Sequence, residues 1–118
     1  MGLSYTLPRA IGLEAAMDVM LTGRSVSADE ARDLGLVRKV VTHDRLMAEA
    51  MAYAEQIAAQ PPIAVQFAKR ALVRSLDSAL LAQLELEWSY QDAAFDTDDA
   101  REGITAFRER RPPRFSGR

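Results

Sequence analysis

Residues 98–118, DDAREGITAFRERRPPRFSGR, decide how this chain is interpreted, because they set two phenylalanines within a run of arginines. The segment is either a disordered basic tail or a helix that holds an anionic ligand with a flat ring. Asp98 and Asp99 suit the positive end of a helix dipole, and Pro112 cannot continue a helix. We therefore expect a helix from Asp98 to about Arg110, followed by an irregular end.

The charge of the chain is segregated around this segment. Residues 83–100 contain six acidic residues and no basic one, whereas residues 101–118 contain six arginines and two glutamates. The net charge of the whole chain is only −2. The two blocks either pair with each other or leave an anion site in the basic part. Because the basic segment is short and follows an acidic one, we expect no nucleic-acid partner.

Length and composition set broad limits. The 118 residues suffice for one small domain or for part of a larger one. The chain is 48% hydrophobic and 27% charged, which is typical of a globular protein. It has no cysteine, which excludes disulfides and thiolate nucleophiles and favours a cytoplasmic protein. No apolar run approaches the roughly 18 residues of a membrane span, so we expect no membrane partner.

Helical signals dominate the first part of the chain. Apolar spacing predicts a helix from Leu13 that ends at Gly23. Ser27 and Glu30 form a capping box for a second, short helix that Gly35 ends. The valine-rich segment that follows, LVRKVV at 36–41, predicts a brief strand, for which SVS at 25–27 is the candidate partner.

Helices also account for the remainder. Apolar stripes predict a helix over 44–59, another that begins at Pro62, and a third after a break near residues 75–77. The last of these carries Leu80, Leu81, Leu84 and Trp88 on one side. We therefore predict one mainly α unit over residues 1–118, with five or six helices and at most a short two-stranded β ribbon.

Few residues have a pattern that indicates catalysis or metal binding. His43 is the only histidine, and no serine or cysteine nucleophile with a triad-like context accompanies it. One imidazole and scattered carboxylates do not make metal-ligand spacing. Glycine-rich phosphate loops are absent from the sequence. The sequence therefore predicts no catalytic residue and no metal site in this chain.

Phe107 and Arg110 are the strongest candidates for ligand binding. They are three residues apart and share one face of the predicted last helix. A ring beside a guanidinium can stack on a purine and bind a phosphate. The alternative is that Phe107 belongs to the core and Arg110 is a surface charge.

The order of several motifs resembles the crotonase superfamily, also called the enoyl-CoA hydratase/isomerase family. The motifs are LPRAIG (7–12), LTGRSVSADEARDLGLVRKVV (21–41), PPIAVQFAKRAL (61–72) and DDAREGITAFRERRPPRF (98–115), with a long helix between the second and third. Agreement at ordered stretches across the whole chain makes the resemblance specific. It implies that residues 1–118 are the C-terminal helical region of such a protein, which serves in oligomerisation and as a lid.

The same resemblance implies what this chain lacks. In the family, an N-terminal spiral domain supplies the paired backbone N–H groups that stabilise an enolate-like oxygen, together with the acidic catalytic residues. No segment of this chain matches that domain. We therefore expect a part of an enzyme that hydrates or isomerises enoyl-CoA thioesters in fatty-acid or aromatic-acid breakdown, and we expect this chain alone to be inactive.

The resemblance also assigns candidate binding residues. Some family members contact the CoA nucleotide through an F-x-x-K motif, which is Phe107 to Arg110 here, with arginine in place of lysine. The apolar face formed by Met17, Met20 and Leu21 is a weaker candidate for the acyl-pocket wall, with core packing as the alternative. The expected ligand is an acyl-CoA substrate, with no separate cofactor.

The family resemblance further predicts a homo-oligomer. Full-length relatives form trimers or hexamers, and for this chain we expect a dimer or a helix-swapped assembly, because apolar surface meant for a partner is left uncovered. The alternative function is a non-catalytic helical self-association module that does not bind CoA.

Overall fold

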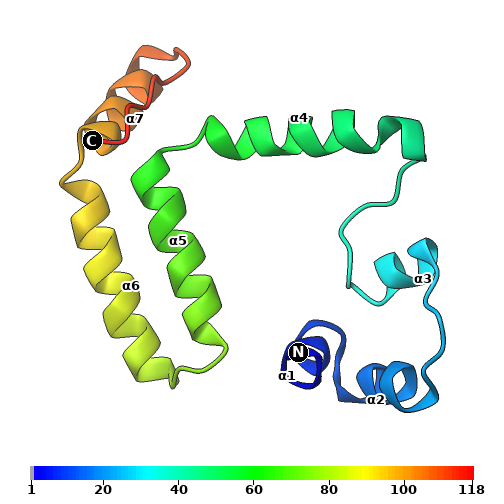
Figure 1. Cartoon of the computed structure of the whole chain (residues 1–118). Helices are drawn as coiled ribbons and strands as arrows, with labels where there is room; N and C mark the ends of the chain where they lie inside the picture. The colour runs from blue at the N-terminus through cyan, green and yellow to red at the C-terminus, as the bar shows by residue number, and fades with distance from the viewer. Residues whose placement is uncertain (1) are drawn as a thin grey trace. The chain divides into compact units, whose positions relative to one another are not determined.

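The computed structural model describes residues 2–118, and across them the chain is helical without any strand (Figure 1). The prediction of a mainly α fold is confirmed. Seven α-helices are present in this part of the chain, because residues 3–11 form a helix that the sequence pattern did not predict. The elements are α1 (Leu3–Ile11), α2 (Leu13–Thr22), α3 (Ala28–Asp33), the 3-10 helix η1 (His43–Arg45), α4 (Leu46–Ala58), α5 (Pro62–Ser75), α6 (Leu80–Phe95) and α7 (Asp98–Glu109).

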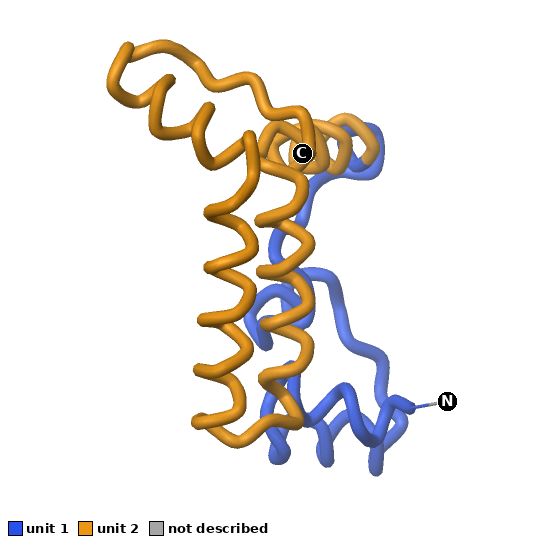
Figure 2. Tube along the Cα trace, turned by 90° about the vertical axis from the view of Figure 1, so that its left-hand side faces the viewer, with its two compact units in different colours: residues 1–46 blue, residues 47–118 orange. Residues whose placement is uncertain are grey.

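The chain divides into two compact units (Figure 2). The N-terminal unit extends to Leu46 and holds α1 to α3 and η1. The C-terminal unit, Met47–Arg118, holds α5 to α7 and all of α4 except its first residue. Among residues 2–118, no helix combines the length and the apolar character needed to cross a membrane.

The core of the N-terminal unit lies between α1 and α2, which pack against each other. Leu7 of α1 and Ala16 of α2 are buried. Helix α1 forms although it contains Pro8, a residue that usually ends a helix. Gly12 separates the two helices, and its N–H donates to the carbonyl of Pro8.

Helix α3 begins and ends where the sequence predicts. The hydroxyl of Ser27 accepts the N–H of Glu30 at 3.2 Å, which is one half of the capping box. The carboxylate of Glu30 instead pairs with Arg24 at 2.7 Å, and Arg24 also pairs with Asp18 of α2 at 2.7 Å. The guanidinium lowers the pKa of Glu30. Arg24 therefore connects the end of α2 to the start of α3.

The strand expected over residues 36–41 does not form within the described chain. The N–H groups of Leu36 and Val37 donate to the carbonyl of Ala31, at 2.8 Å and 3.2 Å. The start of the segment is thus committed to closing the C-terminus of α3 and cannot enter a β ladder.

In the C-terminal unit, α5 and α6 form an antiparallel pair joined by a short connection (Figure 1). The rings of Phe67 and Tyr90 stack across the pair, with centroids 4.6 Å apart. The buried side chain of Gln83 on α6 donates to the carbonyl of Ala71 on α5 at 3.0 Å. Aromatic stacking and one cross-helix hydrogen bond therefore hold the pair in register.

Helix α7 is followed by residues 111–118, which we call the C-terminal strap. The prediction of an irregular end is confirmed, because residues 112–118 form no regular secondary structure. The expectation that this end trails away from the helix is wrong. The strap runs back along α7 until the carbonyl of Arg118 accepts the N–H groups of Asp98 and Asp99, at 2.7 Å and 3.2 Å (Figure 1). The proline pair ends the helix as predicted, and polar contacts then hold the strap against it.

Candidate functional site

The N-terminus of α7 is closed from two sides. The hydroxyl of Thr97 accepts the N–H of Ala100 at 3.1 Å, and the carbonyl of Arg118 accepts the N–H groups of Asp98 and Asp99. Three amides that an α-helix leaves unpaired at its start therefore have partners here. The prediction that Asp98 and Asp99 occupy the first turn is confirmed.

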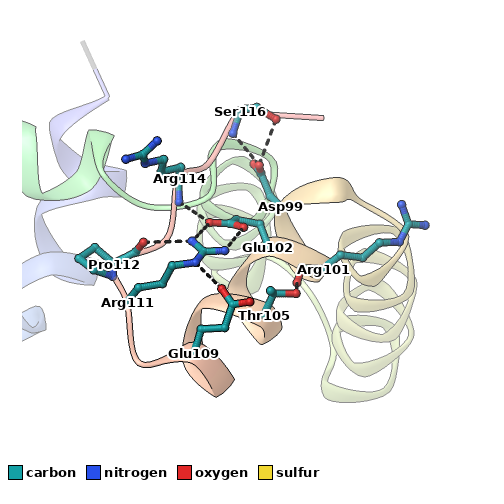
Figure 3. A network of polar contacts seen from close by, with 9 residues as sticks. All are labelled: Asp99, Arg101, Glu102, Thr105, Glu109, Arg111, Pro112, Arg114 and Ser116. Atoms are coloured by element: carbon teal, nitrogen blue, oxygen red, sulfur yellow. Dashed lines mark hydrogen bonds and ion pairs between the residues drawn. The ribbon is translucent and has the colours of Figure 1, made fainter.

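Asp99 is the buried anchor of the strap. It is 2% exposed, and its two carboxylate oxygens accept the N–H groups of Ser116 at 2.6 Å and Gly117 at 2.8 Å. The Ser116 hydroxyl adds a longer contact of 3.3 Å (Figure 3). A buried carboxylate needs such partners, because an unpaired one carries a large desolvation cost. All three of these donors, the two N–H groups and the Ser116 hydroxyl, belong to the strap.

Glu102 forms the second anchor, one turn further along α7 (Figure 3). Its two oxygens accept from the Arg111 guanidinium at 2.5 Å and 2.8 Å, a bidentate arrangement. The backbone N–H of Arg114 also donates to Glu102 at 2.8 Å. The Arg111 guanidinium and, second, the Arg114 N–H lower the pKa of Glu102 to about 2. Arg111 also pairs with Glu109 at 2.6 Å, and both carboxylates raise the pKa of Arg111.

The attachment of the strap at Glu102 should depend on pH only in acid. Because the folded-state pKa is depressed from 4.5 to about 2, the contribution of Glu102 is complete above about pH 4.5 and is lost as the pH falls towards 2. The chemical shift of the Arg114 amide, followed from pH 6 to pH 2, measures this loss. Other carboxylates titrate in the same range, so the comparison is with Glu102→Gln, in which the step should disappear. A step of equal size in that variant would contradict the assignment.

The C-terminus of α7 places Arg110 in the left-handed conformation, with φ of 55°. Its N–H donates to Phe107 at 3.3 Å, and the next N–H, of Arg111, donates to Ala106 at 3.0 Å. Helix α3 ends in the same way, but with Gly35 in the left-handed position. This termination normally uses glycine, because other residues adopt positive φ only at a cost.

The structure corrects one of the two interpretations of Phe107. Its side chain is 84% exposed, so it does not belong to a core within residues 2–118. Arg110 is also exposed and lies at the end of the same turn. A flat ring and a cation are thus both accessible at one helix end, where a nucleotide could stack and pair.

The hollows of the C-terminal unit include two that bear on the predicted site. One, of about 780 Å³, lies between α7 and the strap, and its lining includes Asp99, Glu102 and Arg114 but neither Phe107 nor Arg110. The other, of about 590 Å³, lies beside α5. Its lining includes the three exposed cations Lys69, Arg70 and Arg74. Neither hollow contains the predicted ligand-binding pair.

The candidates for the acyl-pocket wall lie on α2 in the N-terminal unit. Met17, Met20 and Leu21 are all exposed there, so the alternative that they form the core is wrong for the part of the chain described. His43 lies in η1 and is exposed. Residues 2–118 contain no group of three or more His, Asp or Glu side chains that could hold a metal ion.

Sequence reasoning missed Asp99 and Glu102 as anchors. The contacts of Asp99 span 17 and 18 residues, and the Glu102–Arg111 pair spans nine, so neither has helical spacing. The one available signal was the pair of adjacent prolines, because a strap that leaves a helix so abruptly can turn back along it.

The family model described as enoyl-CoA hydratase/isomerase matches residues 1–118. "Probable enoyl-CoA hydratase echA8" of Mycobacterium leprae is 45% identical over 118 residues, which are 100% of this chain and 46% of that protein. (E)-benzylidenesuccinyl-CoA hydratase of Thauera aromatica is 42% identical over 118 residues, covering 98% of this chain and 46% of that protein. The chain thus spans about half the length of these curated relatives.

Solved structures give the same result for the fold. The crystal structure of enoyl-CoA hydratase from Bacillus anthracis matches with a TM-score of 0.96 and 38% identity, over 99% of this chain and 45% of that one. Enoyl-CoA hydratase from Mycobacterium tuberculosis H37Rv matches with a TM-score of 0.94 and 34% identity, over 99% of this chain and 46% of that one. The helical arrangement is therefore one found within larger proteins.

Proposed function

The chain belongs to the enoyl-CoA hydratase/isomerase family, and from this we propose that it is the C-terminal helical part of an acyl-CoA-processing enzyme. The observation that carries the proposal is the family match over residues 1–118 together with a coverage of 46% of the first relative. The reaction we propose for the whole protein is hydration or isomerisation of an enoyl-CoA thioester, in a cytoplasmic enzyme without a separate cofactor.

Within this function, the end of α7 contacts the nucleotide part of CoA. Phe107 offers an exposed ring on which adenine can stack, and Arg110 offers a cation for a phosphate. The side chains of Met17, Met20 and Leu21 are exposed and apolar, and they contribute to the acyl-pocket wall. The oxyanion donors and acidic catalytic groups come from outside these 118 residues, so the chain alone does not turn over substrate.

Titration with CoA, followed through backbone amide signals, tests the contact at α7. The amides of Phe107 and Arg110 should shift at millimolar CoA. Phe107→Ala and Arg110→Gln should each weaken binding about tenfold, because base stacking and a charged hydrogen bond are each worth roughly 1–3 kcal/mol.

The matched controls are Phe95→Ala and Arg74→Gln, which remove an exposed phenylalanine and an exposed arginine elsewhere in the C-terminal unit. Both should bind CoA as the unchanged chain does. Equal losses in Arg74→Gln and Arg110→Gln would mean that CoA is attracted by overall charge alone. Absence of any shift at Phe107 and Arg110 would refute the contact.

A second candidate function is a helical self-association module. The observation that favours it is the exposure of large apolar side chains on α6, among them Leu80, Leu81 and Trp88. Such a surface needs cover, and a homo-oligomer supplies it in either function. A light-scattering mass above that of the monomer, without any response to CoA, would favour the module over the CoA-binding part of an enzyme.

A further inference from the structure

The strap begins at Arg111, directly after Arg110, the last residue of the predicted ligand-binding pair. Arg110 occupies the left-handed position, and its neighbour Arg111 forms the bidentate pair with Glu102. The Glu102 side chain is only 23% exposed, so this pair is partly shielded from solvent. Glu102 also accepts the N–H of Arg114, beyond the two prolines. Glu102 therefore holds the chain after Arg110 at two points, the Arg111 guanidinium and the Arg114 amide.

We propose that Glu102 is a positioning residue for CoA binding: through Arg111 and the Arg114 amide it holds Arg110 left-handed and so presents the Phe107–Arg110 pair. This inference rests on the proposed function. Glu102 itself precedes Phe107 by five residues and Arg110 by eight, and it lines the hollow on the strap side, which contains neither Phe107 nor Arg110. It therefore acts on the ligand through the backbone.

The backbone conformation supplies the physical reason. Arginine in the left-handed region is strained, and such residues persist only where the surroundings impose them. At the end of α3 the same turn uses Gly35 and needs no tie of this kind. Without the anchor at Glu102, Arg110 would be free to return to negative φ, which would change the direction in which its side chain leaves the backbone.

Simple electrostatics predicts the opposite effect of removing Glu102. CoA is an anion, so replacing a nearby negative charge with a neutral amide should strengthen its binding. Positioning predicts that binding weakens. The sign of the change in affinity in Glu102→Gln therefore distinguishes the two roles without any assumption about magnitude.

The experiment measures two quantities in the 118-residue chain. One is CoA affinity, from the amide titration; the other is the sign of φ at Arg110, from its intraresidue amide-to-α-proton cross-peak, which is strong for positive φ. We expect Glu102→Gln to bind CoA at least tenfold more weakly and to lose the strong cross-peak. The matched control is Glu109→Gln, which removes the other carboxylate partner of Arg111 but leaves the strap attached. It should keep the strong cross-peak and, because it also removes a negative charge, should not weaken CoA binding.

Two further measurements test whether the variant is folded and whether Glu102 and Arg111 act through the same interaction. Unchanged amide signals of α5 and α6 in Glu102→Gln show that the unit is folded. The double variant Glu102→Gln with Arg111→Gln should bind no more weakly than the worse single variant, because both remove one interaction. Fully additive losses would overturn the proposal.

The outcomes separate the two proposals. Glu102→Gln with unchanged affinity, or with weaker binding but a retained left-handed Arg110, overturns the positioning role. If the unchanged chain shows no response to CoA, the proposed nucleotide contact fails. The cross-peak then still decides whether Glu102 sets the conformation of Arg110, and an unchanged cross-peak rejects that as well.

Discussion

Replacing Asp99 with alanine should release the end of the C-terminal strap while α7 itself remains helical. The change leaves the N–H groups of Ser116 and Gly117 without their buried acceptor. Hydrogen bonds to a charged partner contribute roughly 1.5–3 kcal/mol, so the local opening equilibrium should rise by about ten- to a hundredfold. Hydrogen exchange of these two amides measures the change directly.

Asp98→Ala is the matched control for this prediction. Asp98 is the preceding residue in the same helical turn, but its side chain is exposed and pairs with the exposed Arg101, at 2.7 Å. An exposed ion pair contributes little, so protection of the strap amides should change by less than about fivefold. Asp99→Asn, which keeps one acceptor oxygen, should fall between the two. Equal protection in Asp98→Ala and Asp99→Ala would contradict the role of Asp99 as an anchor.

Replacing Arg110 with glycine should strengthen the end of α7 and weaken CoA binding at the same time. Glycine adopts φ of 55° without strain, so the helix end should gain about 1 kcal/mol in local stability. The same change removes the cation, and CoA affinity should fall about tenfold. Exchange of the Arg111 amide, which donates to Ala106, measures the first effect, and the CoA titration measures the second.

Arg110→Ala separates the effect of relieving backbone strain from the effect of removing the cation. Alanine keeps the strained φ and lacks the charge, so this variant should lose CoA affinity without gaining stability. If glycine lowers the protection of the Arg111 amide, Arg110 is not strained in the unchanged chain. If alanine and glycine bind CoA as tightly as arginine does, the cation takes no part in binding.

Local patterns predicted the helices well because their signals act over three or four residues. The Ser27 cap, the Gly35 terminus and the acidic first turn of α7 all lie where the sequence places them. Helix α1 escaped prediction because Pro8 is a strong local signal against it. The strand expected after Gly35 failed because the N–H groups of Leu36 and Val37 are used by the preceding helix.

The candidate site was predictable only in part. The spacing of Phe107 and Arg110 and the resemblance to the family pointed to the end of α7, but the spacing carried no information about exposure. The anchors at Asp99 and Glu102 depend on contacts across nine to 18 residues. Such contacts follow from the path of the chain after the two prolines, which no short-range periodicity encodes.

The carbonyl of Arg118 accepts hydrogen bonds from the first two amides of α7, so the two ends of the segment 98–118 are bonded to each other. A change at residue 118 therefore alters the start of the helix. Removal of Arg118 would take away the acceptor of the Asp98 and Asp99 N–H groups and fray a helix that begins twenty positions earlier.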